Sequence, residues 1–156
     1  MNNTELLSKI TAKFASVTEF SPAAGYIKDV ILTLAVPAGS LFNLCKELKE
    51  NQELDFNYVM SLSGVDLGDK LQVVYHLYSL EKKHKLALKI ELERSKPEAT
   101  SVTPLWQAAD WHEREAFDMF GIVFKGHPNL TRILTAEDFE GYPLRKDYAG
   151  KPDQYD

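Results

Sequence analysis

Three segments in the middle of the chain alternate between apolar and other side chains with the two-residue period of β-strands. They cover residues 56–62, 71–80 and 85–92, and short turn-forming stretches separate them. Because short connections join antiparallel neighbours, we expect a three-stranded meander. The last segment alternates most cleanly, which predicts that it buries one face and exposes the other.

Helices are predicted on either side of a fourth strand that precedes this meander. Residues 4–14, with Thr4 as N-cap, and residues 40–50 both place apolar side chains at helical spacing. Residues 29–36 form a nearly continuous apolar run, which is typical of an interior strand. This order of elements favours an α+β fold, with helices packed on one face of a mixed or antiparallel sheet.

Composition limits the functions that the chain can have. The 156 residues fit one domain, and the 44% that are hydrophobic are enough for a sizeable core. The net charge of -5, with no long basic run, argues against a nucleic-acid partner.

Cys45 is the single cysteine, so the chain alone can form neither a disulfide nor a four-cysteine iron–sulfur or zinc site. It lies on the apolar side of the helix expected over 40–50, which predicts a buried, inert thiol. No apolar stretch approaches the ~20 residues that span a bilayer, and the first residues lack the features of a secretory signal. We therefore expect a soluble protein with no direct membrane insertion, which reaches a membrane only through a partner.

The last third of the chain is predicted to have little regular structure. Residues 95–104 contain two prolines and are expected to form a linker, and a helix is expected over 105–121, ending at a glycine. Glycine and proline then recur as far as residue 152, which leaves only a short turn at 136–139. We therefore expect an α+β domain over 1–121 and an extended C-terminal tail over 122–156. Because the tail is rich in apolar residues, we expect it to dock on a partner.

The helix within residues 111–120 is amphipathic and charged. Its polar side carries Trp111, Arg114, Glu115 and Asp118. Arg114 and Asp118 are four residues apart and are able to pair on that surface. Glu113 falls on the opposite, apolar side, where a carboxylate must either reach water at the edge or find a cation. The candidate cations are Arg132 and Arg145.

The same region contains side chains that can bind a metal ion. Glu115, Asp118 and His127 would be the ligands of a small metal-dependent hydrolase, a hypothesis from a different functional class. The zincin pattern that begins at His112 fails, because alanine stands where its second histidine belongs. With no nucleophile elbow or phosphate-binding loop either, we expect no catalytic site and no metal site. The histidine–proline pair at 127–128 is more typical of a structural turn.

Residues 106–148 resemble the signature region of the C-type subunit of respiratory complex I, the NADH–quinone oxidoreductase. The matching positions are Glu113-Arg114-Glu115, Asp118-Met119-Phe120-Gly121, Gly126-His127-Pro128, Arg132-Ile133-Leu134, Gly141, and the run from Pro143 to Tyr148. Thr131 departs from the pattern, because the family usually carries a basic residue there. Since the chain stops soon after Tyr148, we expect a stand-alone subunit and not a C–D fusion.

The resemblance implies a structural subunit that binds no cofactor, in a complex that uses FMN, iron–sulfur clusters, quinone and NADH. It implies a place in the peripheral arm, on the cytoplasmic face of the cell membrane, docked on the D-type subunit next to the quinone site, with B- and I-type subunits nearby. Equivalent subunits of membrane-bound hydrogenases and of deazaflavin- or ferredoxin-linked complexes are an alternative, and a plain globular domain with a disordered tail is another.

The tail arginines and Lys146 are expected to bind carboxylates of the partner, because the arginine fork suits that contact. The residues expected at the partner interface are Glu113, Arg114, Glu115, Asp118, His127, Pro128, Arg132, Leu134, Pro143, Leu144, Arg145, Lys146, Asp147 and Tyr148.

Overall fold

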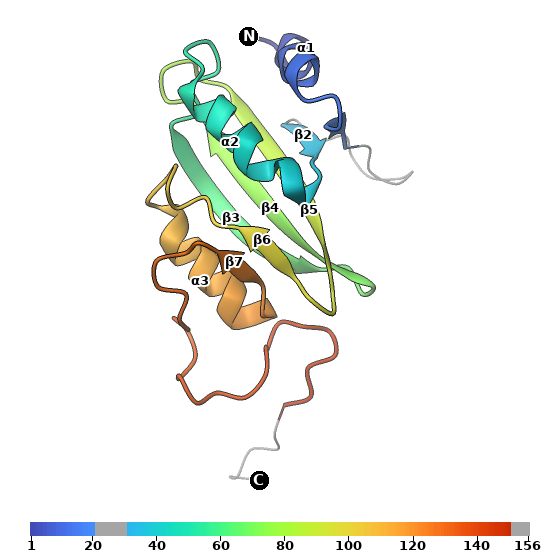
Figure 1. Ribbon diagram of the computed structural model, residues 1–156, viewed down its shortest axis with the longest axis vertical. Coiled ribbons are helices and arrows are strands. Elements are labelled where there is room, and N and C mark those ends of the chain that lie inside the picture. Colours follow the sequence, from blue (N-terminus) through green and yellow to red (C-terminus); the bar gives the residue numbers. More distant parts are fainter. Residues whose placement is uncertain (21–30, 151–156) are drawn as a thin grey trace.

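The computed structural model describes residues 1–20 and 31–150 (Figure 1). Its helices are α1 (Asn3–Lys13), α2 (Leu41–Glu50) and α3 (Ala109–Phe120), with a 3-10 turn η1 (Ala38–Ser40) before α2. Its strands are β1 (Thr18–Glu19), β2 (Leu32–Ala35), β3 (Tyr58–Asp66), β4 (Lys70–Tyr78), β5 (Lys85–Glu93), β6 (Glu98–Thr100) and β7 (Val123–Lys125).

The main sheet has five strands in the order β1-β2-β5-β4-β3. Strands β3, β4 and β5 form the antiparallel meander that their alternation predicts. Strand β2 pairs parallel to β5, because the chain crosses over through α2, and β1 is antiparallel to β2. The predicted mixed sheet is therefore confirmed, and so is the interior position of β2.

The core lies between one face of this sheet and the helices. In Figure 1, α2, α3 and the β6–β7 pair lie in front of the sheet, and the tail forms the end of the molecule opposite to α1. Leu44, Cys45 and Leu48 of α2 and Tyr75 of β4 are fully buried in this core. Burial raises the pKa of the Cys45 thiol, as expected for an inert cysteine.

Local details of the first elements differ from the predictions. Helix α1 is capped by Asn2, which forms a capping box with Glu5, so the prediction of Thr4 as the cap was wrong. The strand expected over 29–36 comprises Leu32–Ala35, and residues 29 and 30 lie outside the described residues.

Strand β3 contains a bulge between Val59 and Ser61, which shifts the alternation by one residue. Tyr58 and Met60 are consequently exposed, whereas Val59 and Leu62 are buried. The uninterrupted alternation expected over 56–62 was therefore wrong, because an inserted residue turns the following side chains to the other face.

A second, two-stranded sheet joins two segments that were expected to be irregular. Strand β6 lies in the expected linker over 95–104, and β7 lies at the start of the expected tail. The two pair in parallel, from Glu98 opposite Val123 to Thr100 opposite Lys125. Each strand has three residues, too few for a recognisable period, so only the spatial meeting of the segments reveals them.

Candidate interaction site

The charged side of α3 holds the tail through one buried carboxylate. The Oδ2 atom of Asp118 accepts the backbone N–H groups of Ile133, Leu134 and Thr135 at 3.0, 2.7 and 2.9 Å. Its Oδ1 atom accepts Nη1 of Arg132 at 2.8 Å and the hydroxyl of Thr135. Five donors therefore converge on a side chain that is fully buried. Although burial opposes ionisation, these donors hold the pKa of Asp118 well below its usual range.

The position of Asp118 corrects two predictions. It was expected on the exposed side of the helix, yet the tail covers it completely. It was expected to pair with Arg114, but Arg114 instead donates to the carbonyl oxygens of Thr131 and Arg132 at 3.1 and 3.0 Å. The helical wheel gives the correct side of α3, but it cannot show that the tail returns to cover that side.

Arg132 closes the tail into a loop. Besides Asp118, it binds the carbonyl oxygen of Gly141 at 3.0 Å through Nη2. Its guanidinium lies 5.6 Å from the ring centre of Phe139 and 5.2 Å from that of Tyr142. The predicted short turn at 136–139 is present, with the N–H of Phe139 on the carbonyl of residue 136. The tail is therefore a folded loop that its own contacts maintain.

A second carboxylate, Asp66 at the end of β3, fixes the far end of this loop. Arg94 binds both oxygens of Asp66, at 2.6 and 3.0 Å, and also reaches Asp147 at 3.0 Å. The backbone N–H of Lys146 donates to Asp66 at 2.8 Å. The guanidinium of Arg94 is the main reason that the pKa of Asp66 lies well below its usual range. No sequence motif identified Asp66 or Arg94, because their partner lies 80 residues further along the chain.

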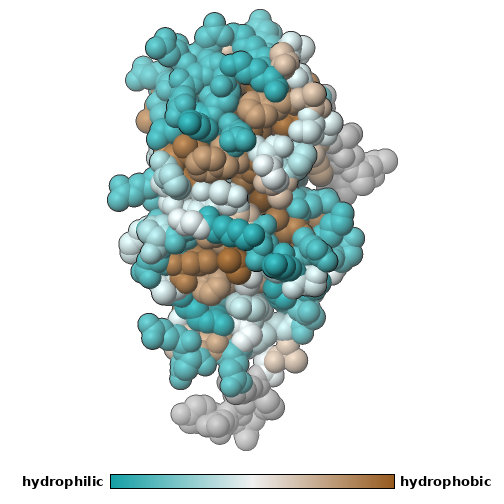
Figure 2. Space-filling model, in the orientation of Figure 1, coloured by the Kyte–Doolittle hydropathy of each residue, from teal (hydrophilic) through white to brown (hydrophobic). Residues whose placement is uncertain are grey.

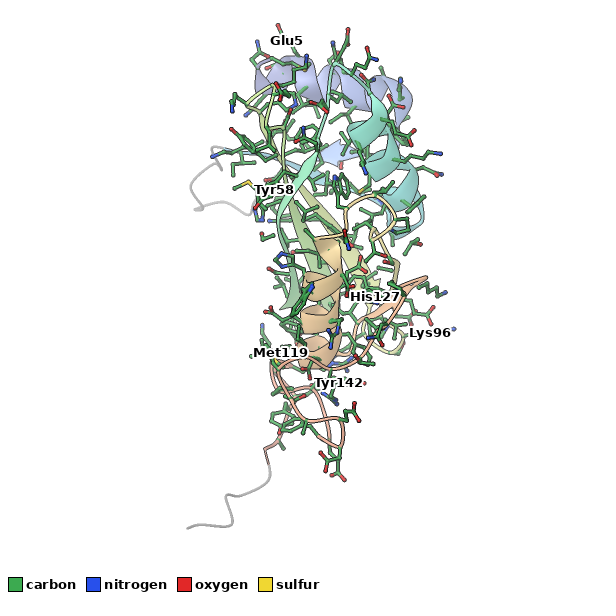
Figure 3. All side chains as sticks on the ribbon, turned by 90° about the vertical axis from the view of Figure 1, so that its left-hand side faces the viewer. Glu5, Tyr58, Lys96, Met119, His127 and Tyr142 are labelled. Carbon is green, nitrogen blue, oxygen red and sulfur yellow. The ribbon has the colours of Figure 1, made fainter. Side chains whose placement is uncertain are left out.

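Between the two carboxylates the tail also bonds to the last turn of α3. The N–H of Leu144 donates to the carbonyl of Met119 at 3.1 Å, and Nε of Arg145 donates to the carbonyl of Phe120 at 2.6 Å. These carbonyls are among those that a helix end leaves without a partner. Gly121 adopts φ 72°, the left-handed conformation expected at a helix end. Figure 3 shows Met119 and Tyr142 close together at this end of the molecule.

Glu113 has a different environment from the one predicted. It is fully buried and accepts the hydroxyl of Ser101 at 2.7 Å and the N–H of Val102 at 2.8 Å. Neither Arg132 nor Arg145 serves as its partner, so both alternatives, a cation from the tail or water at the edge, were wrong. Burial raises the pKa of Glu113 to about 7, against the opposing effect of its two donors.

His127 acts as a structural residue, as its proline neighbour predicts. Its Nε2 atom lies 3.1 Å from Oδ1 of Asp110, and its Nδ1 atom accepts the N–H of Asn129 at 3.0 Å. It therefore ties the turn after β7 to the first turn of α3. Across residues 1–20 and 31–150, no three histidine, cysteine or acidic side chains lie together as a metal site would require. The cluster of Glu115, Asp118 and His127 that the hydrolase hypothesis needs is thus not formed.

Several predicted interface residues remain on the surface of the folded tail and α3. Leu134 is 65% exposed and Leu144 is 55% exposed, although the backbone N–H group of each is bonded to α3. Trp111 is 65% exposed at the start of α3. Glu113 and Asp118, in contrast, are buried and position their own chain. Figure 2 shows hydrophobic patches between polar ones on the face that carries α3.

This fold and this signature define a family of respiratory subunits. The chain belongs to the family described as respiratory-chain NADH dehydrogenase, 30 Kd subunit, which matches residues 34–154. The resemblance noted in the sequence is thereby confirmed.

Two relatives are named as C-type subunits of NADH-quinone oxidoreductase. The protein from Chloroherpeton thalassium is 52% identical over 103 residues, which cover 65% of this chain and 43% of that protein. The second of two such proteins in Rhizobium meliloti is 44% identical over 145 residues, which cover 91% of this chain and 77% of that protein. The alignment thus spans less than half of the first relative and about three quarters of the second.

Solved structures show the same fold. A trypsin-resistant fragment of Nqo5 superposes with a TM-score of 0.65 at 27% identity, covering 83% of this chain and all of the fragment. A chain of a membrane-bound sulfane sulfur reductase, an archaeal respiratory membrane complex, gives 0.77 at 24% identity, covering 94% of this chain and 85% of that one. Among the described residues, no helix is both long enough and apolar enough to cross a membrane.

Proposed function

We propose that this chain is a non-catalytic structural subunit in the peripheral arm of a proton-pumping NADH–quinone oxidoreductase. It docks on the D-type subunit next to the quinone site, with B- and I-type subunits nearby, on the cytoplasmic face of the membrane. It has no cofactor of its own, and FMN, the iron–sulfur clusters, NADH and quinone bind to other subunits. Family membership supports the assignment to this type of complex.

The observation that carries the docking role is the presentation of Leu134 and Leu144. Both side chains are more than half exposed, while their backbone is held by Asp118 and by the end of α3. An isolated chain gains nothing by fixing apolar side chains in water. A partner gains a preorganised surface, because the ordering of the tail is already complete before binding.

The remaining tail residues divide between shaping and contacting. Arg132 and Arg145 bind carbonyls and aromatic rings of their own chain, so they act by shaping the loop and not by reaching partner carboxylates as first expected. The side chain of Lys146 is exposed, with only its backbone bonded to Asp66. Lys146 is therefore the cation that we expect to meet a partner carboxylate.

Replacement of the two leucines tests this proposal. Leu134→Asp together with Leu144→Asp is expected to lower recovery of the tagged protein with the complex, and NADH–quinone reductase activity of the membranes, at least tenfold. Leu67→Asp, at a leucine that is 42% exposed on the turn between β3 and β4, is the matched control. The isolated variants should unfold at the wild-type temperature. Normal assembly of the double variant would refute docking through this surface.

A further inference from the structure

The outer edge of β3 has no strand partner within the described residues, although β3 is nine residues long. Such an edge presents backbone N–H and C=O groups to any extended chain. Proteins usually protect a long edge with lysine, proline or a covering segment. Strand β3 contains no lysine, arginine or proline, and its side chains Tyr58 and Met60 are 48% and 44% exposed. The opposite edge is β1, which has only two residues and is protected by being short.

A hollow lies beside this edge, between β3 and α3. Its volume is about 220 Å³, and its walls are Leu62, Ser63, Gly64, Glu115, Ala116, Met119, Phe120 and Leu144. Gly64 lets α3 approach closely, since a Cβ atom there would lie 2.5 Å from the ring of Phe120. The hollow is largely apolar and continues to Leu144, so it is contiguous with the proposed docking surface of the tail. Figure 3 faces the β3 side of the molecule, with Tyr58 and Met119 along it.

Glu115 gives this hollow a charge. It is exposed on α3, and within the described residues it has neither a hydrogen bond nor an ion pair. Other acidic side chains nearby are engaged: Asp118 binds Arg132, and Asp66 binds Arg94. An unpaired carboxylate beside an apolar hollow matches a segment that carries an aliphatic side chain next to a lysine or arginine.

We infer that β3 and this hollow receive an extended segment of a neighbouring protein of the complex, which adds to the sheet as a further strand beside β3. Its backbone bonds to the free edge, an aliphatic side chain enters the hollow, and a basic side chain pairs with Glu115. This inference rests on the proposed function, because it names the contact through which a second part of the same complex is held.

Two substitutions on this surface test the inference in cells that assemble the complete complex. Ser63→Lys places a charge on the exposed middle of the β3 edge, and Glu115→Lys reverses the charge beside the hollow. Each is expected to lower recovery of the tagged protein with the complex about tenfold or more. Ser8→Lys on α1 and Glu50→Lys on α2 are the matched controls, because both positions are exposed and far along the chain from β3. Thermal unfolding of each isolated variant separates lost binding from lost folding.

Amide exchange supplies an independent measurement. For the wild type, the amides of residues 61–65 that face away from β4 should exchange rapidly in the isolated protein and at least tenfold more slowly in the purified complex. Exchange at equal rates in both samples, or assembly of both lysine variants like the controls, would overturn the inference. If the isolated chain instead forms dimers that Ser63→Lys abolishes, the occupant is a second copy and the inference is also overturned. Failure of the wild type to join any complex would refute the proposed function first, so the two failures are distinguishable.

Discussion

Removal of the negative charge on Asp118 should release the tail while the sheet stays folded. In Asp118→Asn, the amide oxygen still accepts the three backbone N–H groups of residues 133–135. The amide nitrogen replaces the atom that faces Arg132 and the hydroxyl of Thr135, so donors face donors. Hydrogen bonds to charged groups contribute about 1.5–3 kcal/mol each, and the hydroxyl recovers part of its loss by rotating. The variant should therefore hold its tail less tightly by about 3 kcal/mol.

Amide exchange measures this loss where it occurs. At about 1.4 kcal/mol for each factor of ten, the amides of residues 133–135 should exchange roughly a hundredfold faster in Asp118→Asn. Amides in the centre of β4 should keep their protection, because the sheet does not depend on the tail for its hydrogen bonds. Glu115→Gln, one turn earlier on α3 and without a bonded partner in the described residues, is the control and should change stability by less than about 0.5 kcal/mol.

Two results would refute this reasoning. Exchange of residues 133–135 at unprotected rates in the wild type would mean that the tail is not held in solution. Equal protection in wild type and variant would mean that the charge of Asp118 contributes nothing. The dependence on pH has a definite sign as well. Because the folded-state pKa of Asp118 is lowered, the folded chain binds fewer protons there than the unfolded chain, and its stabilising effect is lost as the pH falls below the usual aspartate range.

Three further predictions concern other parts of the structure. The pKa of Glu113 is raised from 4.5 to about 7, so the folded chain binds more protons in this interval and its stability should fall by about 3 kcal/mol as the pH rises through it; Glu113→Gln should remove this slope in urea unfolding at pH 5 and 8. Gly64→Ala should lower the free energy of unfolding by about 1–3 kcal/mol through overlap with Phe120, whereas Gly39→Ala, where a Cβ atom meets nothing within 4 Å, should not. Arg145→Ala should weaken assembly without lowering the melting temperature of the isolated protein, and an equal loss in both would contradict a role confined to the tail.

Features that depend on neighbouring residues in the sequence were predictable. The meander follows from alternation and short turns, the burial of Cys45 follows from helical spacing, and the end of α3 follows from Gly121. Each of these needs only the local period of the chain or the conformational freedom of glycine. The position of β2 inside the sheet belongs to the same group, because a strand that is apolar on both faces must be covered on both.

The candidate site was predicted in its location but not in its contacts. The sequence identified α3 and the tail, and the resemblance identified their residues. It also led to the expectation that the tail arginines would face a partner. The structure instead directs Arg132 to Asp118 and leaves the leucines outside. Helical spacing ranks the sides of one helix, and it carries no information on which distant segment will cover each side.

By itself, then, the sequence determined the class of the fold, the extent of the α3 and tail region, and the family. Only the tertiary structure decided that Asp118 and Asp66 bind the tail, that Glu113 is buried against residues 101 and 102, and that β3 is left with an open edge among the described strands. The donors to Asp118 lie 14 to 17 residues away, and the tail N–H group bound to Asp66 lies 80 residues away. A hydrogen bond depends on the meeting of two groups in space, and at these separations the fold of the whole chain sets that meeting.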